Sequence, residues 1–268
     1  MNLTLKFNAV LLGTMAIGLA GTAAIARHTL HDKARAETLQ NASLMMQAAL
    51  ATRAYTSNHI KPLLENQMKY AFLPESVPSF AATEVFNALR NSKTEYNYKE
   101  AALNPTNPRD RTTDWEADVV TRFRNEATTQ EIVGERDTPN GRYLYLARPI
   151  KITSGSCLQC HSTIDAAPKS MIEKYGTANG FGWQMNETVG AQIVSVPERF
   201  HSERAQTTFN AFMASIAAVF AAVFVVLNLM LTQFVIRPVT QLAALAEDSA
   251  DVRAFLDFIE RGERPLLR

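Results

Sequence analysis

The chain has 268 residues, and its 27 basic and 26 acidic side chains leave a formal net charge of +1. This balance excludes the basic surplus that nucleic-acid-binding proteins carry. With 11 glycines and 20% charged residues, the composition also excludes an intrinsically disordered chain. We therefore expect a globular domain and no nucleic-acid partner.

Two apolar segments predict a membrane protein. Residues 7–26 and 209–236 contain no charged side chain. At 1.5 Å per residue the second segment forms roughly 42 Å of helix, more than the hydrocarbon core requires. The first is either an anchor or a signal peptide, because Ala24-Ile25-Ala26 has the small-x-small form of a cleavage site. We favour an uncleaved anchor, since the segment is longer than a typical signal-peptide core.

Both alternatives carry the intervening residues across the membrane. The sequence therefore predicts an N-terminal anchor at residues 1–29, a translocated domain at 30–208, a transmembrane helix at 209–236 and a cytoplasmic tail at 237–268. The translocated part has the size of one domain.

Within this domain, helices are expected before strands. A long helix is predicted from about residue 30 to 70, with Pro62 as a kink, followed by helices at 81–90 and 114–127, the latter with Asp114 as N-cap. Strands are predicted at 95–101, 130–136, 142–150 and 189–196, and Asn140-Gly141 is a strong hairpin signal between the second and third. This order indicates an α+β architecture with an antiparallel sheet, flanked by two transmembrane helices.

The segment Cys157-Leu158-Gln159-Cys160-His161 has the spacing that covalent haem attachment requires. Each thiol can add to a vinyl group of haem, and the imidazole can ligate the iron on the proximal side. Cys157 and Cys160 are the only cysteines, so neither a disulfide framework nor a four-ligand zinc site is expected. The alternative is a redox pair of cysteines that happens to precede a histidine.

Haem attachment of this kind belongs to the outer side of a membrane, and the two apolar segments supply the membrane. We therefore predict one covalently attached haem c per chain. The expected location is the bacterial inner membrane, with the haem domain in the periplasm. The haem motif is expected in a loop directly after the strand at 142–150, so the haem would lie against the sheet and the long helix.

Six further motifs occur in order along the chain: Arg53-Ala54-Tyr55-Thr56, Asn104-Pro105-Thr106-Asn107-Pro108, Asp114-Trp115-Glu116, Gly141-Arg142-Tyr143, Ala147-Arg148-Pro149-Ile150, and residues 175–183. Together with the haem motif they resemble the Tll0287-like (DUF3365) haem c sensor domain over roughly residues 39–197. The resemblance implies a PAS-like antiparallel sheet with a single covalent haem, in proteins often proposed as redox or gas sensors.

The resemblance also bears on the sixth iron ligand. Some members of the family use a cysteine of the N-terminal helix, and a rough alignment puts Arg53 near that place, which rules out a Cys/His pair and places Arg53 at the haem. The remaining candidates are His59, Met45, Met46, Met68 and Met185. Core packing is the commoner role for each methionine, and a surface position is the commoner one for His59. A vacant or weakly filled sixth position therefore stays open.

Three more residues are candidates for the haem pocket. Arg142 and Arg148 flank the haem motif and could neutralise propionates, since guanidinium groups match carboxylates, although exposed strand charges are an equal alternative. Trp183 could form a wall of the pocket, but core packing is the more common role of such aromatics.

After the second apolar segment, Val235-Ile236-Arg237-Pro238-Val239 and the leucines and alanines that follow resemble the opening of a HAMP linker. The turn and second helix of that linker are not recognisable in residues 251–268. A short solvated tail is therefore an equally good interpretation.

These features favour a periplasmic redox or diatomic-gas sensor that transmits a conformational signal across the membrane to a separate cytoplasmic protein. A membrane-anchored electron-transfer cytochrome with a redox partner is the alternative, and a haem-free sensor with a local disulfide is a third hypothesis. No enzyme activity is expected, because we find no catalytic triad order, HExxH motif or phosphate loop. By analogy with membrane sensors, a homodimer through the long helix is expected.

Overall fold

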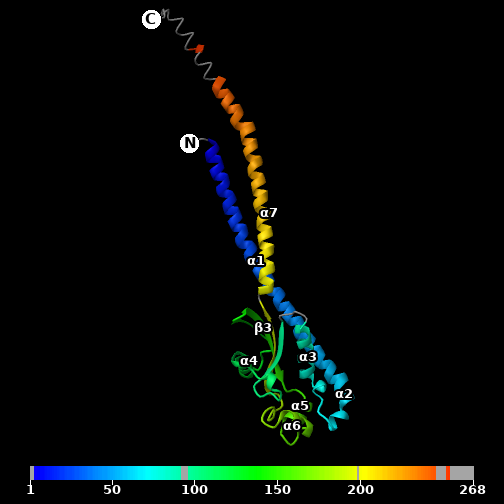
Figure 1. The fold of residues 1–268 in the computed structure, drawn as a ribbon. Helices are drawn as coiled ribbons and strands as arrows, with labels where there is room; N and C mark the ends of the chain where they lie inside the picture. Colours follow the sequence, from blue (N-terminus) through cyan, green and yellow to red (C-terminus); the bar gives the residue numbers. More distant parts are fainter. Residues whose placement is uncertain (1–2, 92–95, 198, 246–251, 254–268) are drawn as a thin grey trace, which may run out of the picture. The chain divides into compact units, whose positions relative to one another are not determined.

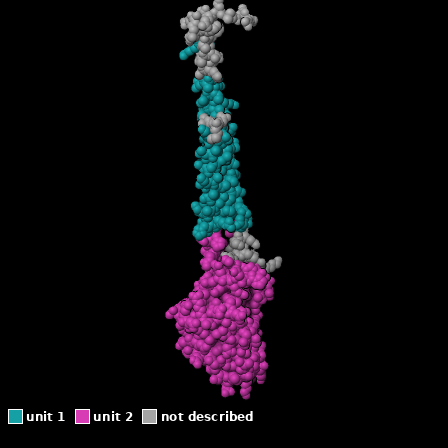
Figure 2. Space-filling model, turned by 90° about the vertical axis from the view of Figure 1, so that its left-hand side faces the viewer, with its two compact units in different colours: residues 1–29, 206–268 teal, residues 30–205 magenta. Residues whose placement is uncertain are grey.

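The computed structural model describes residues 3–91, 96–197, 199–245 and 252–253. They fall into two compact units, one of residues 30–205 and the other of residues 1–29 with 206–268 (Figure 2). The chain passes between the units within its first helix and again near residue 205. The finer division at 208, 236 and 237 stays a prediction.

A four-stranded antiparallel sheet forms the centre of the larger unit (Figure 1). Its strands, in spatial order, are β1 (Asn97–Ala102), β4 (Thr188–Pro197), β3 (Gly141–Lys151) and β2 (Ile132–Thr138). The predicted hairpin is confirmed: Thr138 pairs with Gly141, whose φ of +107° a residue with a side chain rarely adopts. The predicted antiparallel sheet of an α+β domain is likewise confirmed.

The helices of this unit differ from the predictions in three ways. Helix α1 (Leu3–Tyr55) ends in a π-helical turn, η1 (Thr56–Ile60), and α2 (Lys61–Leu64) follows, so no single helix reaches residue 70. Pro62 lacks the amide hydrogen that regular α-helical bonding would use, and the Lys61 amide instead bonds the Thr56 carbonyl. The remaining elements are η2 (Gln67–Lys69), η3 (Pro74–Ser76), α3 (Pro78–Asn91), η4 (Pro108–Asp110), α4 (Asp114–Asn125), α5 (Gly155–His161) and α6 (Lys169–Tyr175).

The second difference is the start of α4, where Thr113 and not Asp114 is the N-cap. The Thr113 amide donates to the Glu116 carboxylate at 2.7 Å, as in a capping box. The third is the haem motif, which forms α5 instead of a loop. A helix of seven residues is too short to show a hydrophobic period in the sequence, but Ser154 caps it by accepting from the Ser156 amide at 3.2 Å.

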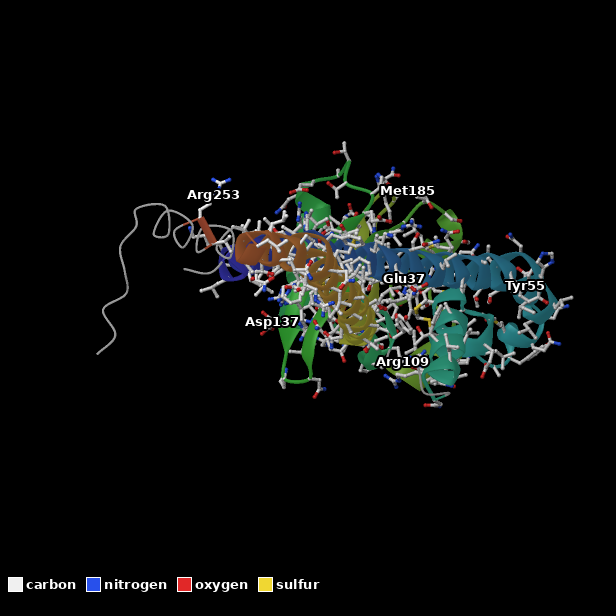
Figure 3. The ribbon with its side chains drawn as sticks, turned by 90° about the horizontal axis from the view of Figure 1, so that it is seen from above. Glu37, Tyr55, Arg109, Asp137, Met185 and Arg253 are labelled. Atoms are coloured by element: carbon white, nitrogen blue, oxygen red, sulfur yellow. The ribbon has the colours of Figure 1, made fainter. Side chains whose placement is uncertain are left out.

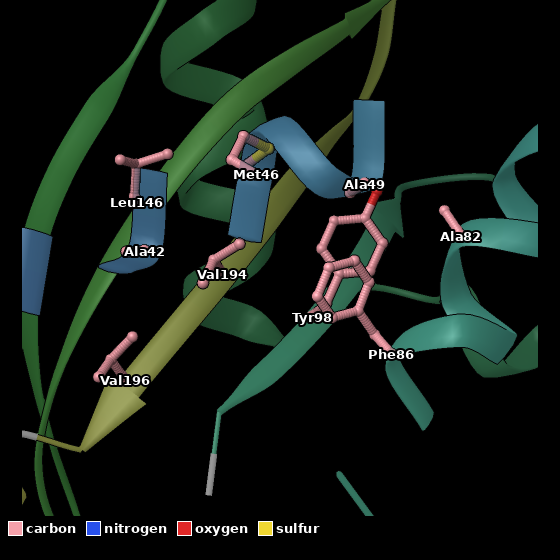
Figure 4. Packing of buried hydrophobic residues seen from close by; sticks show 9 residues of the cluster. All are labelled: Ala42, Met46, Ala49, Ala82, Phe86, Tyr98, Leu146, Val194 and Val196. Atoms are coloured by element: carbon pink, nitrogen blue, oxygen red, sulfur yellow. The ribbon is translucent and has the colours of Figure 1, made fainter. Parts of the chain in front are cut away.

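Two hydrophobic clusters lie on opposite faces of the sheet. On one face, Met46 of α1 and Phe86 of α3 pack on Val194 of β4 (Figure 4). On the other, Phe123 of α4 packs on Ile193, the neighbour of Val194. Successive residues of a strand face opposite sides, so β4 is buried on both faces. The domain therefore has three layers: α1 and α3, the sheet, and α4.

The smaller unit contains the first part of α1 and most of α7 (Arg199–Leu231), which η5 (Thr232–Ile236) extends. The helical stretches Thr4–Leu64 and Ala205–Leu245 are each long and apolar enough to span a membrane. Polar side chains there bond to their own helix: Thr22 to the Gly18 carbonyl at 2.8 Å, and Asn228 to the Phe224 carbonyl at 3.0 Å. Such bonds satisfy the polar groups within the helix itself.

Candidate functional site

The Cys-x-x-Cys-His motif is held at the end of β3. Just past the strand, Ile152 is buried: its amide donates to the Glu187 carbonyl at 2.9 Å, and its carbonyl accepts from the Asn186 amide at 2.8 Å. From there the chain enters α5. Helical spacing puts Cys157, Cys160 and His161 on neighbouring positions of one face. Both thiols are free and partly buried.

His161 is bonded through one ring nitrogen only. Its Nδ1 lies 2.8 Å from the Gly180 carbonyl oxygen, which can only accept, so Nδ1 carries the hydrogen. The ring stacks on Trp183 with centroids 4.0 Å apart, and the His161 carbonyl accepts from the Trp183 amide at 3.1 Å. Among the described residues, no hydrogen bond or ion pair uses Nε2. With this hydrogen on Nδ1, the neutral ring has its lone pair on Nε2.

The electrostatic setting agrees with a neutral ring. Burial lowers the pKa of His161, and the hydrogen bond to Gly180 offsets part of that shift. Burial also raises the pKa of the Cys160 thiol, against the opposing charge of Lys61. The site thus presents a neutral imidazole beside a thiol in its protonated form.

The end of α1 and the start of α2 lie near α5. The charge of Arg53 lies within electrostatic range of Cys157, and that of Lys61 within range of Cys160. α2, α5 and α6 gather at the same end of the domain (Figure 1). The place of a haem against the sheet and the long helix stays a prediction.

Arg53 belongs to a buried polar network that the sequence did not reveal. Its guanidinium forms an ion pair with Glu100, which is only 4% exposed. Tyr98 donates its hydroxyl to the same carboxylate at 2.7 Å, and the Gln192 amide donates to the Tyr98 oxygen at 3.0 Å. Burial and Glu100 raise the pKa of Tyr98, so the phenol stays protonated. The sequence predicted the two strands that carry Tyr98, Glu100 and Gln192, but not that these side chains meet.

The other candidate pocket arginines are paired with carboxylates in β2 or just before it. Arg142 lies at the start of β3, about 30 Å of strand from its end, with Asp137 at 3.1 Å. Arg148 pairs with Glu131 at 2.9 Å. The structure does not bring either guanidinium together with His161, and a role at propionates stays a prediction. Trp183, by contrast, lies directly on His161.

The candidates for a sixth ligand are spread over several elements. His59 is exposed on η1, with its ring 5.2 Å from that of Tyr55. Met46 is fully buried in the core, with Met45 packed against it, and the Met68 sulfur accepts from the Ser76 hydroxyl at 2.6 Å. Met185 is 46% exposed at the surface (Figure 3). The identity of the sixth ligand stays a prediction.

The fold and the site together define a small α+β domain, with a histidine and two cysteines at one end, in a chain with two apolar helices. The model of the Tll0287-like family matches residues 31–197, well over half of the chain, and the chain belongs to this family. Among solved structures, the crystal structure of the cyanobacterial heme-protein Tll0287 is similar, with 18% identity and a TM-score of 0.48. That similarity covers 60% of this chain and 95% of the other. No curated protein matches the chain.

Gly180 is expected to tolerate no side chain. Its φ is +86°, and an added Cβ would lie 2.0 Å from the Thr106 hydroxyl oxygen and 2.9 Å from the Thr106 Cα. Gly180→Ala should lower the free energy of unfolding by about 2–5 kcal/mol, since backbone strain and a clash add. Gly182 is the matched control, because its φ is +80° but nothing lies within 4 Å of its Cβ position.

Gly182→Ala should lower the free energy of unfolding by only about 1–2 kcal/mol, because it strains the backbone without causing a clash. Urea unfolding of the purified full chain in detergent, followed by tryptophan fluorescence, measures both variants. Equal losses in the two variants would contradict the tight contact between Gly180 and Thr106.

Asp110 makes the stability of the domain depend on pH. Its side chain is 20% exposed. Burial, together with the charge of Glu100, raises the pKa of Asp110 to about 6, against the opposing charges of Arg109 and Lys99. Folded Asp110 therefore binds a proton more tightly than unfolded Asp110. Its stabilising contribution is full below about pH 4 and is lost as the pH rises through 6.

Asp110→Asn removes this titration and should raise the free energy of unfolding by about 1–3 kcal/mol at pH 7.5. At pH 4 the variant and the wild type should be equally stable. Urea unfolding at both pH values provides the comparison, with Asp118→Asn, an exposed carboxylate of α4, as control. A gain of the same size at both pH values would count against a buried, titrating Asp110.

Proposed function

We propose that the chain is a membrane-anchored c-type haem protein that senses redox state or a diatomic gas on the periplasmic side of a bacterial inner membrane. The observation that carries the proposal is the bonding of His161: Nδ1 donates to Gly180, and Nε2 is left free beside two unpaired thiols. Metal-ligating histidines characteristically donate the other ring nitrogen in this way. Family membership supports haem in particular, since the family takes its name from Tll0287, which is described as a heme-protein.

The residues fit covalently attached haem. Cys157 and Cys160 would hold it through two thioether bonds, and His161 Nε2 would ligate the iron. Such a haem supplies a redox-active iron whose sixth position can take a small ligand. Trp183 would keep the imidazole plane in place by stacking, and Arg53 would set a positive charge near Cys157.

The connections of the domain support signalling over simple electron carriage. Arg53 lies on α1, whose N-terminal part is the first candidate span, and β4 leads through one residue into α7. Both chain connections of the domain therefore run into apolar helices, whereas an electron carrier needs one anchor. We further propose that the antiparallel sheet is PAS-like, that the role is non-enzymatic, and that a separate cytoplasmic protein receives the signal.

Covalent attachment predicts that the double variant Cys157→Ser, Cys160→Ser loses all haem stain after denaturing electrophoresis. The reason is that serine cannot form the thioether bonds. The proteins are expressed in a host that matures c-type cytochromes, with Ser156→Ala as a control that leaves both thiols intact. A wild type without stain, or a double variant that keeps it, would refute covalent attachment.

Sensing at an open site predicts that carbon monoxide shifts the absorption of the reduced wild-type protein within the time of mixing. A vacant or weakly held sixth position accepts the gas, whereas two strong protein ligands exclude it. Spectra of the reduced protein with and without carbon monoxide provide the measurement. A spectrum that does not respond favours the alternative, a membrane-anchored electron-transfer cytochrome.

A further inference from the structure

The segment that follows β1 contacts the loop that holds His161. Asn104 accepts a hydrogen bond from the Gly180 amide at 3.0 Å through its side-chain oxygen. Its side-chain nitrogen donates to the Phe181 carbonyl at 3.2 Å. Because backbone amides only donate and carbonyls only accept, one orientation of the Asn104 amide satisfies both bonds.

The two hydrogen bonds of Asn104 lie on either side of the Gly180 carbonyl, which is the hydrogen-bond acceptor of His161. In chain order, the Gly180 carbonyl lies between the Gly180 amide and the Phe181 carbonyl. That enclosed carbonyl accepts the Nδ1 hydrogen of His161 at 2.8 Å. Asn104 therefore holds the acceptor from both sides without touching the imidazole.

Thr106 restricts the movement of Gly180 in the other direction. Its hydroxyl oxygen lies 3.4 Å from Nδ1 of His161. It also occupies the space where Gly180 has no side chain, 2.0 Å from the position a Cβ would take. Gly180 thus cannot move toward residues 104–106, and the bonds of Asn104 oppose movement away from them.

The strength of the bond to Gly180 has a chemical consequence for the ring. An imidazole whose Nδ1–H donates to a firmly held acceptor is a more basic ligand at Nε2. A more basic axial ligand favours Fe(III) over Fe(II), which lowers the reduction potential. Releasing the acceptor should therefore raise the potential.

We propose that Asn104 is a positioning residue for His161: by fixing the Gly180 carbonyl, it sets the basicity of the proximal ligand and the reduction potential of the site. This inference rests on the proposed haem function. It also assigns a role to the Asn104 and Gly180 motifs, which lie 76 residues apart in the sequence.

A matched control lies three residues away in the same motif. The Asn107 side chain accepts from the Arg109 amide at 3.2 Å and caps η4. Among the described contacts, none joins Asn107 to residues 179–183. Asn107→Ala thus removes a comparable local hydrogen bond without touching the loop of His161.

The test measures two quantities on the full chain in detergent for wild type, Asn104→Ala, Asn104→Ser and Asn107→Ala. The first is amide hydrogen exchange of residues 179–183 in the haem-free protein. The second is the reduction potential of the haem-loaded protein, by redox titration followed in the visible spectrum. The serine variant is smaller but polar, and it serves if the alanine variant does not fold.

We expect the Asn104 variants to exchange the Gly180 amide at least about tenfold faster, because its acceptor is gone. We also expect their Fe(III)/Fe(II) equilibrium to shift about tenfold toward Fe(II), which is 59 mV for one electron. Asn107→Ala should change neither quantity. Faster exchange with an unchanged potential would leave Asn104 with a merely structural role and overturn the inference.

Unchanged exchange in the Asn104 variants would overturn the inference as well. Equal shifts of the potential in the Asn104 and Asn107 variants would do the same. If the wild type takes up no haem, the proposed function fails on its own, and the exchange data alone then decide whether Asn104 holds the loop.

Discussion

The hydrogen bond from His161 Nδ1 to the Gly180 carbonyl is the constraint on which the site depends. It fixes the tautomer, orients the ring onto Trp183 and leaves Nε2 as the free nitrogen. The rest of the domain makes this bond possible. β3 leads into α5, which carries His161. Residues 180–183 precede β4, and the segment that follows β1 packs on these residues. Three strands of one sheet thus set the position of one imidazole.

A second constraint is the burial of Glu100 in the sheet. A carboxylate that is 4% exposed needs compensation, and Arg53, Tyr98 and Gln192 supply it. The ion pair ties α1 to β1 at the level of Cys157. Removal of Arg53 would leave the buried Glu100 carboxylate without its countercharge. The charge of Arg53 also acts on Cys157, so the end of α1 is coupled electrostatically to that thiol.

Local patterns in the sequence predicted much of the fold and one part of the site. Asn140-Gly141 predicted the hairpin, and the spacing of Cys157, Cys160 and His161 singled out the residues on which the proposed haem site is built. The sequence could not predict what bonds His161, because Asn104 and Gly180 meet only through the sheet. The cap of α4 was misplaced by one residue, since Thr113 and Asp114 are both good N-cap residues. Helix α5 was missed because seven residues show no period.

The position of β4 in the sheet and in the chain has a consequence for how the domain folds during synthesis. This strand is central in the sheet and is the last of the described strands, and it pairs Asn97 with Ser195 and Leu146 with Val194. During synthesis β1 and β3 therefore have no common neighbour until residue 197 has emerged, and such long-range pairing is slow. In the proposed topology the cysteines cross the membrane before β4 does. If haem is attached covalently as proposed, the thiols would then be accessible while the sheet is still unfinished, and closure of the sheet would bring Gly180 and Trp183 onto the histidine.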